Sequence, residues 1–166
     1  MTEKKASPPK PVFKAVKIDN AAWMPEIAEH IQRFCQKAHV DGVQPGNLQT
    51  YFAQVAQGLH GKHTAEFWMV FEDEKPVAFA SWTVLGLPHI AKVYWFALYS
   101  WQKTSNEPVE LMVDEYLKFG EKWNAVWLSS DLVSKSLVRL VTRIANKRGY
   151  DVKEGGLIHL TMRKPL

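Results

Sequence analysis

The last quarter of the chain, residues 125–166, reads AVWLSSDLVSKSLVRLVTRIANKRGYDVKEGGLIHLTMRKPL. Its pattern predicts a strand over AVWLSS, a helix over the middle segment and a strand over the tail EGGLIHLTMRKPL. In the middle segment, apolar residues recur at helical spacing and form one face, while the basic residues lie elsewhere around the helix. The helix is therefore amphipathic and covers another part of the molecule with its apolar residues Leu137, Leu140, Val141, Ile144 and Ala145.

The end of this helix is marked by its residue types. Lys147 and Arg148 lie in the last turn, where cations interact favourably with the negative end of the helix dipole. Gly149 follows, and glycine readily adopts the left-handed backbone with which many helices end. We therefore expect the helix to stop at Gly149.

A strand, a helix that closes in Lys147-Arg148-Gly149-Tyr150, and a short strand that closes in Met162-Arg163-Lys164 resemble the C-terminal half of the GNAT acyltransferase superfamily. This resemblance covers about the last 75 of the 166 residues, and the N-terminal half by element order. It implies an α/β (α+β) fold with a GNAT-like mixed central sheet of about six to seven strands, flanked by about four helices.

The rest of the sequence gives an element order that agrees with this fold. Apolar alternation and helical spacing predict strands and helices in the order strand, helix, helix, three strands, helix, strand, helix, strand. The predicted strands before the last quarter cover residues 12–18, 67–71, 77–85 and 91–100. The helices begin near Asn20, Asn47 and Pro108, and the last of these has an apolar stripe of Val109, Met112, Val113, Tyr116, Gly120 and Trp123.

Composition indicates one domain over residues 12–166, because 46% of the 166 residues are hydrophobic and this length can bury a sizeable core. Residues 1–11, MTEKKASPPKP, are rich in proline and lysine and are expected to form a flexible N-terminal arm. A single cysteine, Cys35, excludes an internal disulfide and a cysteine-based metal site. We find neither a signal-peptide core nor an apolar run of membrane-spanning length, and therefore expect neither secretion by a signal peptide nor membrane insertion.

The charge is unevenly distributed along the chain. The net charge is +4, and residues 134–166 contain eight Lys or Arg against two acidic residues. Arg139, Arg143 and Lys147 form a stripe on the predicted helix, but no nucleic-acid reader motif accompanies them. We expect weak and nonspecific nucleic-acid contact at most.

The resemblance directs attention to the acetyl-CoA site of GNAT enzymes, which lies along the fourth strand and the helix after it. There, a glycine-rich loop offers backbone N–H groups to the diphosphate. The corresponding loop here, residues 101–108, reads WQKTSNEP and contains no glycine. Glu107 and Glu110 place carboxylates in the first turn of the helix, and Pro108 removes an amide. The resemblance therefore implies a degenerate acetyl-CoA loop.

The catalytic residues of the family are also missing from their usual positions. The tyrosine that many members use to protonate the leaving thiolate corresponds to Ala145, and the fourth strand, AKVYWFALYS, has no carboxylate. Tyr99 or Tyr94 is a candidate acid, and Glu72 or His89 a candidate base. The histidines show no metal-ligand spacing, so no metal site is expected. If the chain is active, Tyr99 is the best acid, and the cofactor-binding residues are Ala97, Tyr99, Trp101, Lys103, Thr104, Ser105 and Asn106.

A second resemblance concerns the biological role. The runs KWNAVWL at 122–128 and VYWF at 93–96 look similar to the small GNAT-like proteins carried in virions of short-tailed bacteriophages. The first hypothesis is therefore a GNAT-fold protein with an eroded acyl-CoA site and no cofactor, which acts as a bacteriophage virion or assembly component. Its partners would be other virion or assembly proteins, or further copies of itself as an oligomer, in the virion or the host cytoplasm. The alternative is an active acetyl-CoA-dependent N-acyltransferase that acts on a small amine or a protein amine.

Overall fold

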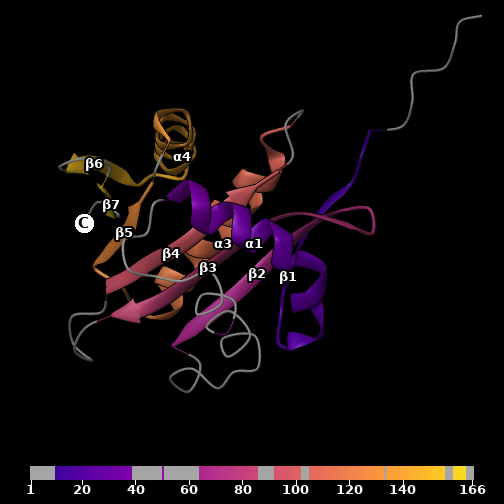
Figure 1. The fold of residues 1–166 in the computed structure, drawn as a ribbon. Helices are drawn as coiled ribbons and strands as arrows, with labels where there is room; N and C mark the ends of the chain where they lie inside the picture. The colour runs from indigo at the N-terminus through magenta and orange to yellow at the C-terminus, as the bar shows by residue number, and fades with distance from the viewer. Residues whose placement is uncertain are drawn as a thin grey trace, which may run out of the picture.

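The computed structural model describes residues 10–38, 50, 64–85, 92–101, 105–132, 134–155 and 159–163. These residues form one seven-stranded sheet with the order β1-β2-β3-β4-β5-β7-β6 (Figure 1). Neighbouring strands are antiparallel except β4 and β5, which run parallel. The mixed sheet that the sequence predicts is thereby confirmed, with strands β1 (Phe13–Lys17), β2 (Ala65–Glu72), β3 (Lys75–Leu85), β4 (Lys92–Ser100), β5 (Trp127–Asp131), β6 (Asp151–Gly155) and β7 (His159–Arg163).

Helices cover both faces of this sheet. Helix α1 (Met24–Ala38) follows a short 3₁₀ helix, η1 (Ala21–Trp23), and lies in front of the sheet in Figure 1. Helix α3 (Glu107–Lys122) lies behind it, and α4 (Lys135–Lys147) packs beside α3. The second predicted helix, residues 47–59, lies outside the described residues apart from Thr50, and so do residues 1–9 of the predicted arm.

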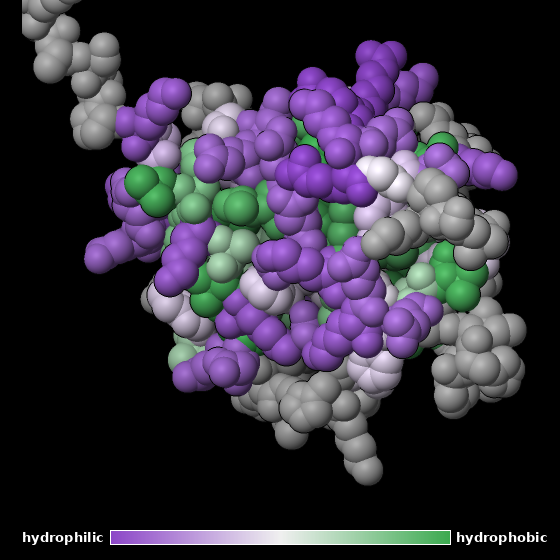
Figure 2. All heavy atoms as spheres, turned by 180° about the vertical axis from the view of Figure 1, so that it is seen from behind, coloured by the Kyte–Doolittle hydropathy of each residue, from purple (hydrophilic) through white to green (hydrophobic). Residues whose placement is uncertain are grey.

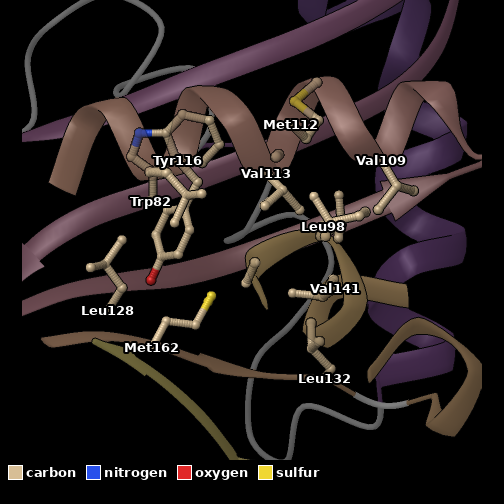
Figure 3. Close-up of a cluster of buried hydrophobic side chains, with 14 of the residues drawn as sticks. Trp82, Leu98, Val109, Met112, Val113, Tyr116, Leu128, Leu132, Val141 and Met162 are labelled. Atoms are coloured by element: carbon tan, nitrogen blue, oxygen red, sulfur yellow. The ribbon is translucent and has the colours of Figure 1, made fainter. Parts of the chain in front are cut away.

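Alternation along β3 separates the two sides of the core. Phe79 belongs to the cluster that contains Ile31 of α1, whereas its neighbours Ala78 and Ala80 belong to the cluster that α3 completes. This arrangement follows from strand geometry, since successive side chains point to opposite faces. The α3 cluster surrounds the fully buried Trp82 and Tyr116 (Figure 3).

The sequence placed the apolar stripe of α3 correctly. Val109, Met112, Val113 and Tyr116 are buried, and Pro108 lies at the first turn, where its missing N–H costs little. Helix α3 is also the crossover that joins the parallel strands β4 and β5, which cannot be connected by a tight turn.

Helix α4 differs in one respect from the expectation. Its buried residues are Val138, Val141, Ile144 and Ala145, whereas Leu137 and Leu140 are only half-buried. The inward face is therefore rotated from the predicted one, because α4 packs against both the sheet and α3. The predicted helix stop is confirmed, since Gly149 has a φ of +81°.

The C-terminal tail forms two strands where the sequence suggested one. Residues 151–155 form β6, which pairs with β7, and β7 lies between β5 and β6. Sequence reasoning placed a single strand after Gly149, over residues 154–166, because an edge strand with exposed Asp151 and Lys153 carries little apolar alternation.

The surface over the back of the molecule is mainly hydrophilic, with hydrophobic side chains visible between polar ones (Figure 2). In the described part of the chain, the exposed large hydrophobic residues are Val12, Leu85 and Val126. Most of the large aromatic side chains described contribute to the two core clusters instead, Trp82, Phe67 and Phe79 being fully buried.

Candidate functional site

The sheet opens where β4 and β5 stop pairing. The two strands are paired from Lys92 with Trp127 to Trp95 with Ser130, after which β4 continues to Ser100 with β3 on one side. Next to this point, the β3–β4 register shifts by a bulge that leaves Phe96 as an extra residue. We call the opening between residues 96–100 of β4 and the end of β5 the split. In the part of the chain that the structure describes, no strand pairs with this edge of β4, so its backbone groups can pair with an extended ligand.

Two buried serine hydroxyls without hydrogen-bond partners belong to the strands of the split. Ser130 is the last residue of β5 that pairs with β4, and its side chain is 0% exposed. Ser100 is the last residue of β4. Neither hydroxyl oxygen has a partner within the described residues. By strand alternation they lie on the same side of the sheet as Leu128 and Leu98, the side covered by α3. Buried polar groups are usually paired, so two orphans here indicate a place for a polar ligand.

A hollow of about 430 Å³ lies between the start of α3 and the side of α4. We call it the α3–α4 hollow. Arg139 and Arg143 are both exposed and lie one turn apart on α4. No ion pair of either guanidinium occurs among the described residues. The hollow is therefore electropositive, and it is lined by Asn106, Ser136, Leu137, Arg139, Leu140 and Arg143. A second hollow of about 570 Å³ shares the two arginines and adds Thr142, Asn146 and Lys147.

The first turn of α3 has already used its backbone donors. The N–H of Glu107 donates to Ser105 Oγ over 3.1 Å, and the N–H groups of Val109 and Glu110 donate to the carbonyl of Asn106 over 3.0 Å. Pro108 has no N–H. These positions therefore offer no amide to an anion, and Glu107 and Glu110 add two carboxylates. An anion in the α3–α4 hollow must be held by side chains, chiefly Arg139 and Arg143.

An aromatic cluster occupies the α1 side of the end of β4. Tyr99 packs on Phe34, Phe79 and Trp101 with ring centroids 5.9 to 6.2 Å apart. The ring of His30 on α1 stacks on Trp101 at 3.8 Å. Burial and the nearby Arg33 lower the pKa of His30, against the opposing charge of Glu29, so the imidazole is neutral at pH 7.

The structure brings together some of the residues that the sequence nominated. Ala97 and Tyr99 belong to the part of β4 beyond its pairing with β5, and Asn106 lines the α3–α4 hollow. Ser105 Oγ accepts a hydrogen bond from the N–H of Glu107 at the start of α3, and the N–H of Trp101 donates to the carbonyl of Val77 on β3 over 3.0 Å. Lys103, Thr104 and His89 lie outside the described residues.

The other two nominated residues lie away from the split. Glu72 is at the turn between β2 and β3, and Tyr94 is in the paired part of β4, opposite Ser129. Sequence reasoning missed the contributions of Ser100, Ser130 and His30. It recognised the arginine spacing on α4, but could not foresee that α4 docks beside the start of α3.

The described residues contain no group of three or more His, Cys, Asp or Glu side chains that could hold a metal ion. Among the helices described, none has both the length and the apolar character needed to cross a membrane.

Comparison with solved structures identifies the fold. The chain is similar to a predicted acetyltransferase with acetyl-CoA from Clostridium acetobutylicum, with a TM-score of 0.61 and 16% identity over 88% of this chain and 94% of that one. It is also similar to the PaiA N-acetyltransferase from Thermoplasma acidophilum in complex with coenzyme A, with a TM-score of 0.56 and 11% identity over 93% and 99% of the two chains. An acetyltransferase of the GNAT family from Streptococcus pneumoniae gives a TM-score of 0.58 and 10% identity over 91% and 96%.

No protein-family model matches the sequence, and no curated protein matches it significantly. The chain therefore has the GNAT fold, at a sequence identity that speaks for the fold alone. The virion role and the protein partners expected from the sequence stay predictions.

Proposed function

We propose that the protein is an acyl-CoA-dependent N-acyltransferase that transfers an acetyl group from acetyl-CoA to an amine. The observation that carries this proposal is the split with two orphaned buried hydroxyls, followed along the chain by the electropositive α3–α4 hollow. The similar solved proteins named as acetyltransferases support it by analogy of fold.

The split fits the arm of coenzyme A, which is an extended chain with two amide groups. Residues 96–100 of β4 span about 16 Å, at roughly 3.3 Å for each residue of a strand. The edge of these residues that faces the split, with which no described strand pairs, would bond to the amides as a further strand does. Ser130 at the closed end and Ser100 at the open end would supply hydroxyls that have no other partner among the described residues.

The α3–α4 hollow fits the phosphates of coenzyme A. It would bind them through side chains, whereas a glycine-rich loop binds them through backbone amides. The α3 amides at Glu107, Val109 and Glu110 are bonded within the chain, so the guanidinium groups of Arg139 and Arg143 would provide the positive charge. Arginine binds phosphate well because its planar donors can engage two oxygens at once. Two guanidinium groups would also offset the carboxylates of Glu107 and Glu110.

When acetyl-CoA is bound, its thioester supplies an activated acyl group. In the transfer, a bond would form between the amine nitrogen and the acyl carbon, and the carbon–sulfur bond would break. The nitrogen would lose a proton to water, and the leaving thiolate would take one up. Residues 96–100 of β4, which no described strand pairs on the side of the split, would orient the thioester, and such positioning can provide a large part of the rate. Tyr99 lies on the part of β4 that borders the split, and it is our candidate donor of the proton to the thiolate.

Replacement Tyr99→Phe tests this role. We expect kcat to fall by about 100-fold, at the lower end of the range for a general acid, with KM for acetyl-CoA within about twofold. Turnover is measured by thiol release from acetyl-CoA with a panel of amines. Tyr150→Phe, which removes a hydroxyl that bonds to Glu121, is the control. An unchanged kcat in Tyr99→Phe would remove Tyr99 from the mechanism.

Calorimetry with acetyl-CoA tests the function as a whole. We expect micromolar binding by the wild type and a loss of about 100-fold in the double variant Arg139→Ala/Arg143→Ala, because two charge-assisted contacts at the lower end of their range, about 1.5 kcal/mol each, correspond to about two orders of magnitude. Arg33→Ala is the matched control, since Arg33 pairs with Glu29 on the exposed face of α1. Absence of binding by the folded wild type would contradict the proposal.

A non-enzymatic role in a virion or assembly is the second candidate. The observation that favours it is the start of α3, where the amides at 107, 109 and 110 are bonded internally and two carboxylates stand in the first turn. Light scattering on the calorimetry sample separates the two functions. A defined oligomer without acetyl-CoA binding supports the assembly role, whereas a monomer that binds acetyl-CoA supports the enzyme.

A further inference from the structure

The hydroxyl of Tyr116 lies between two backbone carbonyls that belong to different strands of the sheet. Its oxygen is 2.9 Å from the carbonyl oxygen of Val93 on β4 and 2.8 Å from that of Ser129 on β5. Tyr116 is 0% exposed and stands on α3, and Figure 3 shows its ring beside Leu128 and Met162. A phenol has one proton, so it can donate a full hydrogen bond to only one of these carbonyls at a time.

This contact lies in the paired segment of β4 and β5, within two residues of the split. The last residue pair of the parallel strands is Trp95 with Ser130, and the pair before it is Tyr94 with Ser129. Val93 is two residues before the last paired residue of β4, and Ser129 is one residue before the last paired residue of β5. A hydroxyl that can donate to either strand here links β4 and β5 close to the point where the split begins.

Helix α3 lies close to β5 at the position that this contact requires. Gly120 is one helical turn after Tyr116, and a Cβ atom there would come within 2.7 Å of Cδ2 of Leu128. The absence of a side chain allows the helix to approach β5, and this approach brings the phenol within reach of both strands. Tyr116 and Gly120 thus act together on the β4–β5 pair.

We propose that Tyr116 is a positioning residue that fixes the closed end of the split and thereby places the acyl group for transfer. This inference rests on the proposed function, because it concerns how the same site holds acetyl-CoA. The phosphates would be held by Arg139 and Arg143, while Tyr116 controls the other end. Substitution of Tyr116 should therefore affect the placement of the acyl group, whereas substitution of the arginines should affect phosphate binding.

The test compares Tyr116→Phe with Tyr150→Phe, which also removes one phenolic hydroxyl next to α3. Two ligands are titrated by calorimetry: acetyl-CoA, which fills the split and the hollow, and adenosine 3′,5′-bisphosphate, which fills the hollow alone. In Tyr116→Phe we expect acetyl-CoA affinity and kcat to fall by about tenfold, as expected for a misplaced reacting group. Affinity for the bisphosphate stays within about twofold of the wild type, because the phosphate contacts are distant from the substitution. Tyr150→Phe changes neither.

Hydrogen exchange provides a second readout that does not depend on a ligand. The amides of β5 exchange faster in Tyr116→Phe than in Tyr150→Phe if the phenol holds β5 to β4. Equal loss of both ligands, or unchanged acetyl-CoA affinity, kcat and β5 exchange, overturns the positioning role. A wild type that binds the bisphosphate but not acetyl-CoA, or neither, overturns the proposed function, and with it the inference that rests on it.

Discussion

Glu66 shows how one buried carboxylate can be stabilised by its neighbours. Its side chain is 6% exposed, and its oxygens accept from Lys17 Nζ at 2.8 Å and Trp68 Nε1 at 2.9 Å, with Lys122 Nζ at 3.6 Å. Burial raises the pKa of Glu66, but the hydrogen bonds from Lys17 and Trp68 and the charges of Lys17 and Lys122 outweigh it. The pKa of Glu66 therefore lies below its ordinary value.

Stability is expected to depend on pH through this residue. A carboxyl group whose folded pKa is depressed contributes stability above its unfolded pKa, near 4.5, and that contribution is lost as pH falls through the folded pKa. Glu66→Gln should therefore cost about 1–2 kcal/mol at pH 7, from the loss of charge-assisted hydrogen bonds. The difference from wild type should shrink below pH 4.5. Urea unfolding over a pH series measures both, with Glu29→Gln on an exposed pair as control. A difference that is constant with pH would contradict the linkage.

At the scale of residues, the sequence predicted which side chains face inward better than it predicted their hydrogen-bond partners. It identified Tyr116 as an inward residue of α3 from apolar periodicity alone. The carbonyls that its hydroxyl contacts belong to residues 13 and 23 positions away, on two strands. Such contacts depend on the docking of the helix on the sheet, and periodicity carries no information about docking. The orphaned hydroxyls of Ser100 and Ser130 could not be predicted for the same reason.

At the scale of elements, long periodic segments were predicted well and short edge segments poorly. The apolar stripe of α3 and the stop of α4 at Gly149 follow from local residue types, which act within one or two turns. Strand β6 is five residues long and lies at the sheet edge, so it needs little apolar character. The seventh strand was therefore missed by the pattern, although the family resemblance allowed for it.

The close approach of α3 to β5 gives a prediction for Gly120→Ala. A methyl group there would meet Leu128, which is 2% exposed and has little room to move. Overpacking of this kind costs about 1–3 kcal/mol, whereas replacing a helical glycine by alanine gains about 0.5–1 kcal/mol. We expect a net destabilisation of about 1–2 kcal/mol, measured as a lower Tm.

The companion variant separates the two contributions. Leu128→Val shortens the facing side chain, so the double variant should be less destabilised than the sum of the two single substitutions. If Gly120→Ala instead raises Tm, then β5 yields to the methyl group and the helix approach is not a tight constraint on the split.

At the scale of the whole molecule, the fold brings the basic and the acidic segments of the sequence together. The basic C-terminal quarter supplies Arg139 and Arg143, and the acidic segment before it supplies Glu107 and Glu110 at the start of α3. The fold brings the arginines to the start of the helix that carries these carboxylates, at the hollow that Asn106 lines. Arg148 on the same basic segment bonds Asp114 of α3 through two nitrogens at 2.9 Å. The charge asymmetry along the sequence could attract nucleic acid. In the folded molecule, some of these basic residues lie beside acidic residues of α3, so part of the asymmetry is balanced within the protein.

The split divides the sheet into two blocks, β1 to β4 and β5 to β6, which share four residue pairs across the parallel strands. A molecule bound between the blocks would contact both, so its affinity and their spacing are thermodynamically linked. A second ligand that binds elsewhere and prefers one spacing of the blocks would change the affinity of the split for its own ligand. By reciprocity, the ligand in the split would change the affinity of the second ligand by the same factor.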